Sequence, residues 1–131
     1  MVKQAKVTHF EVPAENMERA KKFYADVFGW VMFPPDPVMG YQTVGTGKVD
    51  EKFMPAELGA INGGIIKREG AMKNPIVTLQ VDDIDASLES VTKHGGKVTM
   101  KKMPAGTMGF FAYFEDSEGN VMGLWQATGG M

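Results

Sequence analysis

The chain has 131 residues, no cysteine and a formal net charge of −2, with 14 basic and 16 acidic residues spread along its length. This length suits one domain with a core of its own, and the missing cysteines exclude disulfides, thiolate metal ligands and cysteine nucleophiles. Without a basic stripe nucleic acid is a poor partner, and no apolar run is long enough to span a membrane. No secretory leader precedes the first strand pattern, so we expect a cytoplasmic protein.

The first half of the chain alternates between strand and helix patterns. A β-branched and aromatic run over residues 7–12 predicts a strand that ends at Pro13. Asn16 is a good cap for the helix that follows, and Gly29 stands where a glycine ends a helix. The apolar residues of this helix recur at helical spacing and should face the sheet: Met17, Ala20, Phe23, Tyr24, Val27 and Phe28. Further strands are predicted at residues 30–33, 41–44 and 61–67, with a loop over 45–59.

The same order of elements returns after a polar link over residues 68–75. Asp82 or Asp83 caps a second helix, which ends at Gly95-Gly96. A turn at Pro104 separates two of the strands, and a hairpin turn over residues 116–120 precedes the last one. The strands of this half are predicted at residues 76–81, 97–100, 110–115 and 121–126.

The two halves form an internal repeat. At a constant offset of 67 their first strand–helix–strand stretches superpose without a gap, so that His9 corresponds to Ile76 and Gly29 to Gly96. A repeat of this size means that each half supplies half of one core. We therefore expect an α+β domain in which the helices lie outside a mixed sheet and the opposite sheet faces line a shared concavity.

Three motifs taken together resemble a known family. The first runs through His9-Phe10-Glu11-Val12-Pro13, Arg19-Ala20-Lys21-Lys22-Phe23-Tyr24 and Phe28-Gly29-Trp30; the second is Val81-Asp82-Asp83-Ile84-Asp85-Ala86 with Gly95-Gly96-Lys97-Val98; the third is the 116–120 turn with Leu124-Trp125-Gln126. As a set they resemble the vicinal-oxygen-chelate (VOC) superfamily of glyoxalases, bleomycin-resistance proteins and dioxygenases, and within it the lactoylglutathione-lyase-related proteins.

The resemblance implies the whole architecture. It implies one domain over residues 1–131, made of two tandem βαβββ modules at about 5–68 and 75–127. Their curved mixed sheet would form half-barrels around one concave pocket, with the helices outside. A homodimer is also expected, because such modules leave sheet edges that a twofold partner covers.

Metalloenzymes of the superfamily carry one metal ligand on each of four strands. The resemblance maps these positions to His9, the stretch Asn62-Gly63-Gly64, Ile76 and Gly123. A divalent ion needs three or four protein ligands, and His9 alone is of the required type. We therefore predict no metal cofactor in the standard place, with His9 as a ligand if a metal is present. The glycines of the stretch should instead permit close approach of backbone or ligand. The alternative is a metal-dependent lyase whose ligands are rearranged, recruiting Glu11, Glu57 or Glu115.

Strand alternation assigns side chains to the pocket or to the core. If His9 faces the pocket, so does Glu11, whereas Phe10 and Val12 face the helix. The same alternation predicts the ligand-binding residues Thr78, Gln80, Phe111, Tyr113 and Trp125. It predicts for the core Val77, Leu79, Val81, Phe110, Ala112, Phe114, Met122 and Leu124.

The predicted pocket suggests a function in outline. His9 and Glu11 form a candidate general acid–base pair, although His9 also has a structural interpretation as a hydrogen-bond partner of Glu11 or Gln80. The aromatic residues either pack or hold a planar ligand. We expect a protein that binds or processes a small molecule without the standard metal site. It is either a glyoxalase-like lyase or isomerase, or a module that sequesters an antibiotic or metabolite.

Overall fold

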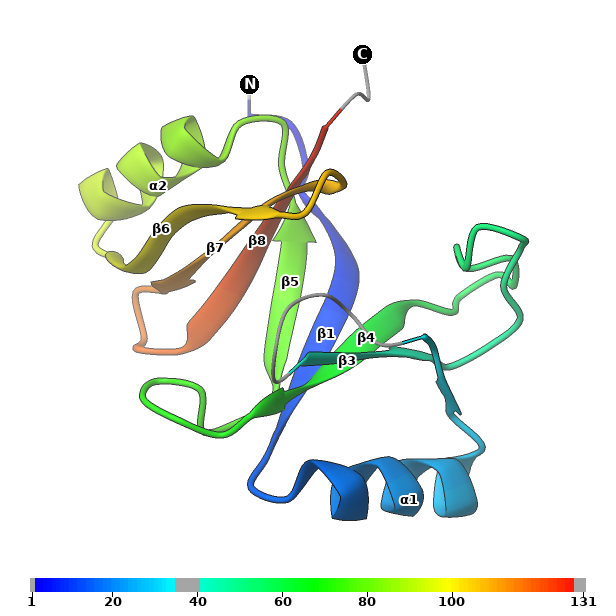
Figure 1. Cartoon of the computed structure of the whole chain (residues 1–131). Helices are drawn as coiled ribbons and strands as arrows, with labels where there is room; N and C mark the ends of the chain where they lie inside the picture. The colour runs from blue at the N-terminus through cyan, green and yellow to red at the C-terminus, as the bar shows by residue number, and fades with distance from the viewer. Residues whose placement is uncertain (1, 35–40, 129–131) are drawn as a thin grey trace. The chain divides into compact units, whose positions relative to one another are not determined.

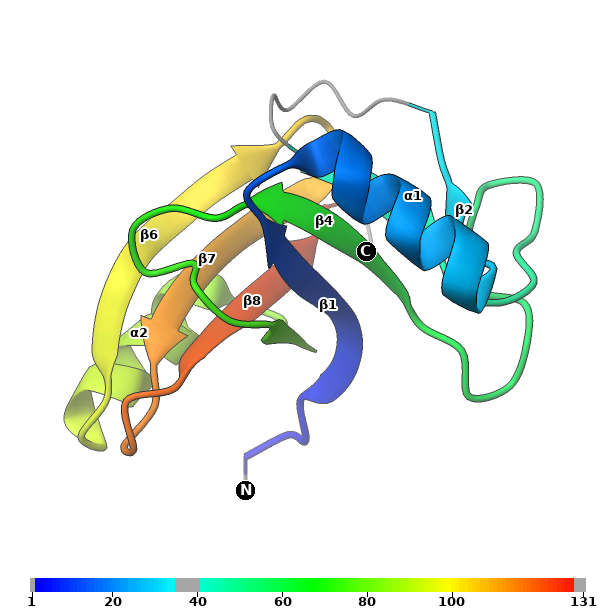
Figure 2. The ribbon, with the colours of Figure 1, turned by 90° about the horizontal axis from the view of Figure 1, so that it is seen from below.

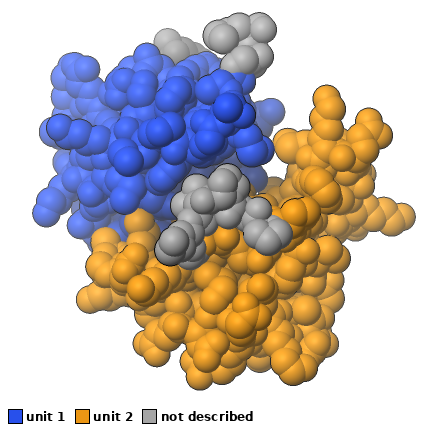
Figure 3. All heavy atoms as spheres, viewed as in Figure 1, with its two compact units in different colours: residues 1–8, 76–131 blue, residues 9–75 orange. Residues whose placement is uncertain are grey.

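The computed structural model describes residues 2–34 and 41–128, and within them the chain forms eight strands and two helices (Figure 1). It divides into two compact units, residues 9–75 and residues 1–8 with 76–131 (Figure 3). Each unit has a βαβββ order of elements, with one parallel and two antiparallel strand pairs. This confirms the predicted α+β class and its modules. No helix in the described residues is long and apolar enough to cross a membrane.

The unit of residues 9–75 places its helix on one face of a four-stranded arrangement (Figure 2). Its elements are β1 (Lys6–Ala14), whose first residues belong to the other unit, α1 (Met17–Phe28), β2 (Val31–Met32), β3 (Tyr41–Gly45) and β4 (Asn62–Lys67), in the strand order β2-β3-β4-β1. The predicted cap is present, since Asn16 Oδ1 accepts a hydrogen bond from the Arg19 amide at 2.9 Å. Gly29 ends the helix with φ +71°, a conformation that favours glycine.

The core of this unit is built around three buried residues, Ala14, Val44 and Ile65, with Phe10, Met17, Ala20, Tyr24, Trp30 and Met32 packed against them. Half of the predicted helix stripe stays outside this core: Phe23, Val27 and Phe28 are 51%, 56% and 63% exposed. Phe23 and Val27 lie at the edge of the stripe and Phe28 is the last residue of the helix, so the sheet does not reach them. The expectation for these three residues was therefore wrong.

Strand β1 is longer than predicted. It continues through Pro13, which pairs in register with Ile66 of β4. The pairing ends with the Arg68 amide donating to the Ala14 carbonyl at 2.9 Å.

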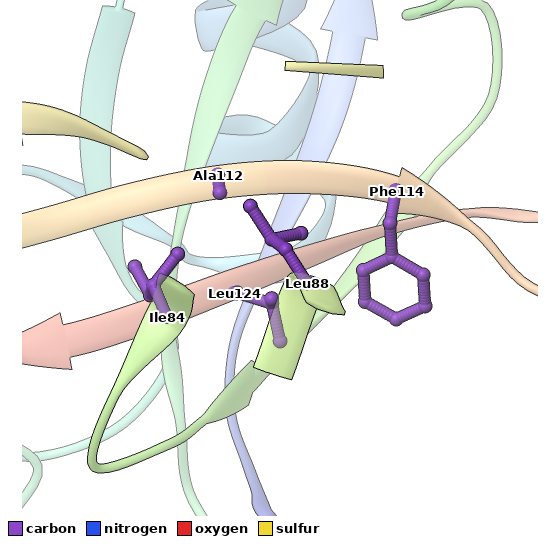
Figure 4. Packing of buried hydrophobic residues seen from close by; sticks show 5 residues of the cluster. All are labelled: Ile84, Leu88, Ala112, Phe114 and Leu124. Atoms are coloured by element: carbon purple, nitrogen blue, oxygen red, sulfur yellow. The ribbon is translucent and has the colours of Figure 1, made fainter. Parts of the chain in front are cut away.

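The other unit repeats the arrangement around a larger core. Its elements are β5 (Ile76–Gln80), α2 (Ile84–Lys93), β6 (Lys97–Ala105), β7 (Gly109–Glu115) and β8 (Val121–Ala127), in the strand order β5-β8-β7-β6. Asp83, one of the two candidate caps of α2, accepts a hydrogen bond from the Ala86 amide through Oδ1 at 3.1 Å. Gln126 Oε1 also accepts from the Ile84 amide at 2.8 Å, which ties β8 to the start of α2. The buried cluster is Ile84, Leu88, Ala112, Phe114 and Leu124 (Figure 4).

Two predictions for this unit were wrong. Val77 was placed in the core but is 39% exposed, because α2 packs over β6, β7 and β8, and from β5 only Leu79 joins the cluster. Strand β6 does not end at Met100 but runs on to Ala105 and includes Pro104. β6 is an edge strand, where proline is tolerated, and two shifts of register let it stay paired with β7.

Candidate functional site

His9 lies on the face of β1 that alternates away from α1, since its neighbour Phe10 packs into the helix-side core. Its Nε2 is 2.6 Å from the Tyr41 hydroxyl, and the two rings are nearly parallel, at 9°. The bond is O–H···N or N–H···O according to the tautomer of the imidazole. Burial lowers the pKa of His9 from 6.5 to about 4, because a charged imidazole there would lose its hydration. The ring is therefore neutral near pH 7.

Two adjacent glycines make room for aromatic rings on opposite faces of β4. A methyl group on Gly64 would lie 2.5 Å from Cζ of Tyr41, and one on Gly63 would lie 2.3 Å from Cζ of Phe10. The close approach predicted for these glycines is thus made by aromatic side chains. Gly63 admits the ring that fills the core, and Gly64 admits the ring that bonds to His9.

Glu11 shares the face of His9, as predicted. Its side chain is buried, with 4% exposed, and it pairs in register with Gly64, which pairs in turn with Thr43 of β3. Side chains in one such row point to the same side of a sheet. A buried carboxyl group, a neutral imidazole and a phenol therefore lie on one face of this unit. Tyr41 and Thr43 belong to it although the sequence analysis missed them.

The donor atoms of this face do not fit a divalent ion. Within the described residues no three His, Asp or Glu side chains come together as a group that could hold one. Nε2 of His9 is engaged by Tyr41, Asn62 Nδ2 donates to the Phe53 carbonyl at 2.7 Å, and Ile76 is buried. Glu57 accepts from the Lys48 amide in an exposed loop. Among the residues that the structure describes, neither the four matched positions nor His9 with Glu11, Glu57 and Glu115 forms such a group.

The five predicted ligand-binding residues come together on one face of the other unit. Thr78, Gly123 and Tyr113 form one row across β5, β8 and β7, and Gln80, Trp125 and Phe111 form the next. Leu79, Ala112 and Leu124 pack on the opposite face against α2, which confirms the predicted alternation.

This second face is graded in polarity and exposure. Thr78 and Tyr113 are buried, Phe111 and Trp125 are half-buried, and Gln80 is exposed. The rings of Phe111 and Tyr113 meet edge to face at 6.0 Å. Met100 and Met103 of β6 pair with Tyr113 and Phe111 and are 39% and 47% exposed, so two flexible thioethers extend the face. A ligand-binding role for this face, and one pocket shared by both faces, stay predictions.

Comparison with known proteins identifies the family. The family model for the glyoxalase/bleomycin resistance protein/dioxygenase superfamily matches residues 6–124. The chain belongs to this superfamily. A glyoxylase-like domain-containing protein of Didymella fabae is 32% identical over 98% of this chain and 99% of its own. A lactoylglutathione lyase of Haemophilus influenzae is 31% identical over 86% of each chain.

A solved structure supports the same fold at low sequence identity. The VOC chain matches a Streptomyces coelicolor methylmalonyl-CoA epimerase variant in complex with 2-nitronate-propionyl-CoA, with a TM-score of 0.65, 15% identity and coverage of 95% of both chains. At this identity the likeness shows the fold alone. The predicted family is thus confirmed, and the chain is a small-molecule binding or processing protein of the VOC superfamily.

Proposed function

We propose that this VOC protein binds a small organic molecule on the face formed by His9, Glu11 and Tyr41, without the divalent ion of the metalloenzymes in its superfamily. The hydrogen bond between Nε2 of His9 and the Tyr41 hydroxyl carries the proposal, since it engages the one histidine at a matched metal-ligand position. Few, convergent polar groups beside aromatic rings are typical of small-molecule sites. The face of Thr78 and Trp125 in the other unit is proposed to contact the same class of ligand through its rings.

Acid–base catalysis is a second candidate, favoured by the burial of Glu11. A buried carboxyl group two residues from a neutral imidazole is a candidate general base. In a lyase or isomerase step, Glu11 would take the proton from a carbon next to a carbonyl group and return it to a neighbouring atom of the same molecule. Binding without chemistry, as in a sequestering module, would need only the face itself.

A panel of 2-oxoaldehydes, 2-oxo acids and ketones tests the proposal on protein treated with a chelator. We expect saturable binding that the chelator leaves unchanged and that His9→Ala weakens. Elemental analysis of untreated protein should find no stoichiometric zinc, nickel, manganese or iron. Turnover that is lost in Glu11→Gln while binding persists would establish the catalytic candidate. Binding restored only by a divalent ion would refute the proposal and favour a metal-dependent lyase.

A further inference from the structure

A cavity of about 340 Å³ lies where β1 passes into α1, within the unit of residues 9–75. It is lined by the end of β1, the first two turns of α1 and the segment after β4, whose last residues lie beside those of β1 (Figure 2). His9 and Glu11 are not in the lining, and alternation along β1 places them on the face opposite to Val12, which is. The cavity is therefore separate from the face of His9.

Both arginines of the chain line this cavity. Of the 14 basic residues only Arg19 and Arg68 are arginines, and none of the lysines is in the lining. The guanidinium of Arg19 is exposed and makes no hydrogen bond or ion pair with the residues that the structure describes. Arg68 donates to Oε1 of Glu15 at 3.4 Å and to the Pro13 carbonyl at 3.5 Å, both long for hydrogen bonds. Both arginines therefore keep N–H donors for a ligand, arranged in the planar fork that matches the oxygens of a carboxylate or phosphate.

The charge around the cavity is positive. The charged side chains of the lining are two cations, Arg19 and Arg68, and one anion, Glu15. The charged residues next to the lining along α1 and after β4 pair with one another: Glu18 with Lys21, Lys22 with Asp26, and Lys67 with Glu69. Lys73, in the segment after β4, adds another positive charge. A negatively charged group in the cavity would therefore meet net attraction among the described residues.

An exposed aromatic ring borders the same cavity. Phe23 is 51% exposed, and its ring meets that of Tyr24 edge to face at 5.1 Å. Tyr24 is stacked on Trp30 at 4.4 Å, and both pack against the core, so the position of Phe23 is supported from below. Ala20 contributes only a methyl group to the lining, which leaves space beside the rings. Aromatic side chains hold a ring through stacked or edge-to-face contacts.

We infer that this cavity is a second binding site, for a small aromatic oxyanion: an aryl carboxylate or an aryl phosphate. Arg19 and Arg68 donate to the charged oxygens, and the ring of the ligand packs against Phe23. The volume suits one ring with its acid group, because it is at the lower end of the roughly 300–1,000 Å³ of small-molecule sites. None of these residues belongs to the face of His9, so the two proposals stand or fall separately.

Three probes separate the charge from the ring. Phenylacetate carries both, phenylacetamide has the same ring without the charge, and acetate has the charge without the ring. Because the chain has only two arginines, their side-chain Nε–H signals can be followed by NMR and assigned with Arg19→Gln. We expect phenylacetate to shift both signals saturably, and phenylacetamide and acetate to bind more weakly. Phenyl phosphate should also bind, and its affinity relative to phenylacetate identifies the preferred acid group.

Variants of one helix separate a site from general attraction, with binding read from the Arg68 signal. Arg19→Gln should weaken phenylacetate binding about 3- to 10-fold, the loss of one charge-assisted contact at an exposed side chain. Arg19→Lys keeps the charge but loses the planar fork, so it should also weaken binding. Phe23→Leu should reduce the preference for phenylacetate over acetate. Lys22→Gln is the matched control, because it removes the same charge from α1 outside the cavity and should leave the affinity unchanged.

Several results would overturn the inference. One is equal affinity of wild type and Arg19→Gln for phenylacetate, and another is equal affinity of the wild type for phenylacetate and either phenylacetamide or acetate. A loss in Lys22→Gln as large as that in Arg19→Gln would reveal long-range attraction without a site. Failure of both phenylacetate and phenyl phosphate to shift the arginine signals would also overturn it. So would binding that His9→Ala abolishes, but the proposed function would then stand, because the ligand would occupy the face of His9.

Discussion

Adding one methyl group to each of two neighbouring glycines should have different effects. At Gly63 it should lower the stability of the fold, and at Gly64 it should break the hydrogen bond between Tyr41 and His9. A methyl group on Gly63 would sit 2.3–2.5 Å from three ring atoms of Phe10, more than 1 Å inside the usual carbon–carbon separation of about 3.5–4 Å. Phe10 packs against the buried cluster of its unit and lies 5.3 Å from the ring of Trp30, so it has little room to retreat. Overpacking of this kind costs about 1–3 kcal/mol.

The methyl group on Gly64 meets a ring that can move away. Tyr41 is half-buried and lies off the core, so the main loss is its hydrogen bond to His9, about 0.5–1.5 kcal/mol. Neither glycine has a positive φ, so alanine also gains about 0.4–1 kcal/mol by restricting the unfolded chain. We expect Gly64→Ala to be nearly neutral in stability and Gly63→Ala to cost roughly 1 kcal/mol more than Gly64→Ala.

Urea unfolding followed by tryptophan fluorescence measures both free energies under the same conditions. The midpoint should fall clearly for Gly63→Ala and hardly for Gly64→Ala, whereas the response of His9 to ligand should change only in Gly64→Ala. A loss for Gly64→Ala as large as that for Gly63→Ala would refute the assignment of the two rings to opposite faces. So would an unchanged midpoint for Gly63→Ala.

The remaining predictions concern stability. The pKa of His9 falls from 6.5 in the unfolded chain to about 4 in the folded one, so the unfolded state binds the proton first as pH falls. The free energy of unfolding should therefore be about 2 kcal/mol lower at pH 5 than at pH 7, and His9→Gln should lack this loss. An equal loss in the variant would contradict the prediction. Asp83→Ala should lower the free energy of unfolding by about 1 kcal/mol, because it removes the N-cap of α2. Asp82→Ala should change it little, because Asp82 forms only an exposed ion pair with Lys3. Equal effects of the two variants would count against the cap. Ile84→Ala should cost about 2–5 kcal/mol because the side chain is fully buried, and Val27→Ala, in the exposed part of the α1 stripe, should stay within about 0.5 kcal/mol; a large loss at Val27 would show that the stripe is covered.

Much of the fold follows from patterns local to the chain. The unit around α2 was predicted closely because the helical spacing of Ile84 and Leu88 and the alternation of Ala112 and Phe114 define the same core independently. Strand ends were less predictable. A proline usually marks a turn, but at Pro104 the edge position and the shifts of register let the strand continue.

The candidate site was predicted only in part, because strand alternation needs an anchor. On β1 the family motif supplied His9, and Glu11 then followed. Strand β3 carries no motif residue, so nothing in the sequence assigned Tyr41 to a face. Its contact with His9 joins residues 32 positions apart and depends on the register of β3 with β4. The one signal in the sequence was Gly64, which indicated that another group packs closely against β4 at this position but not that this group is the ring of Tyr41.

The most direct test of the account follows the imidazole nitrogens of His9 by NMR while an equimolar amount of Zn²⁺ is added to chelator-treated protein. If Tyr41 and not an ion holds Nε2, the signals of His9 should be the same before and after the addition, and Tyr41→Phe should shift them. A stoichiometric shift of Nε2 on addition of zinc, with tight retention of the metal, would contradict the account.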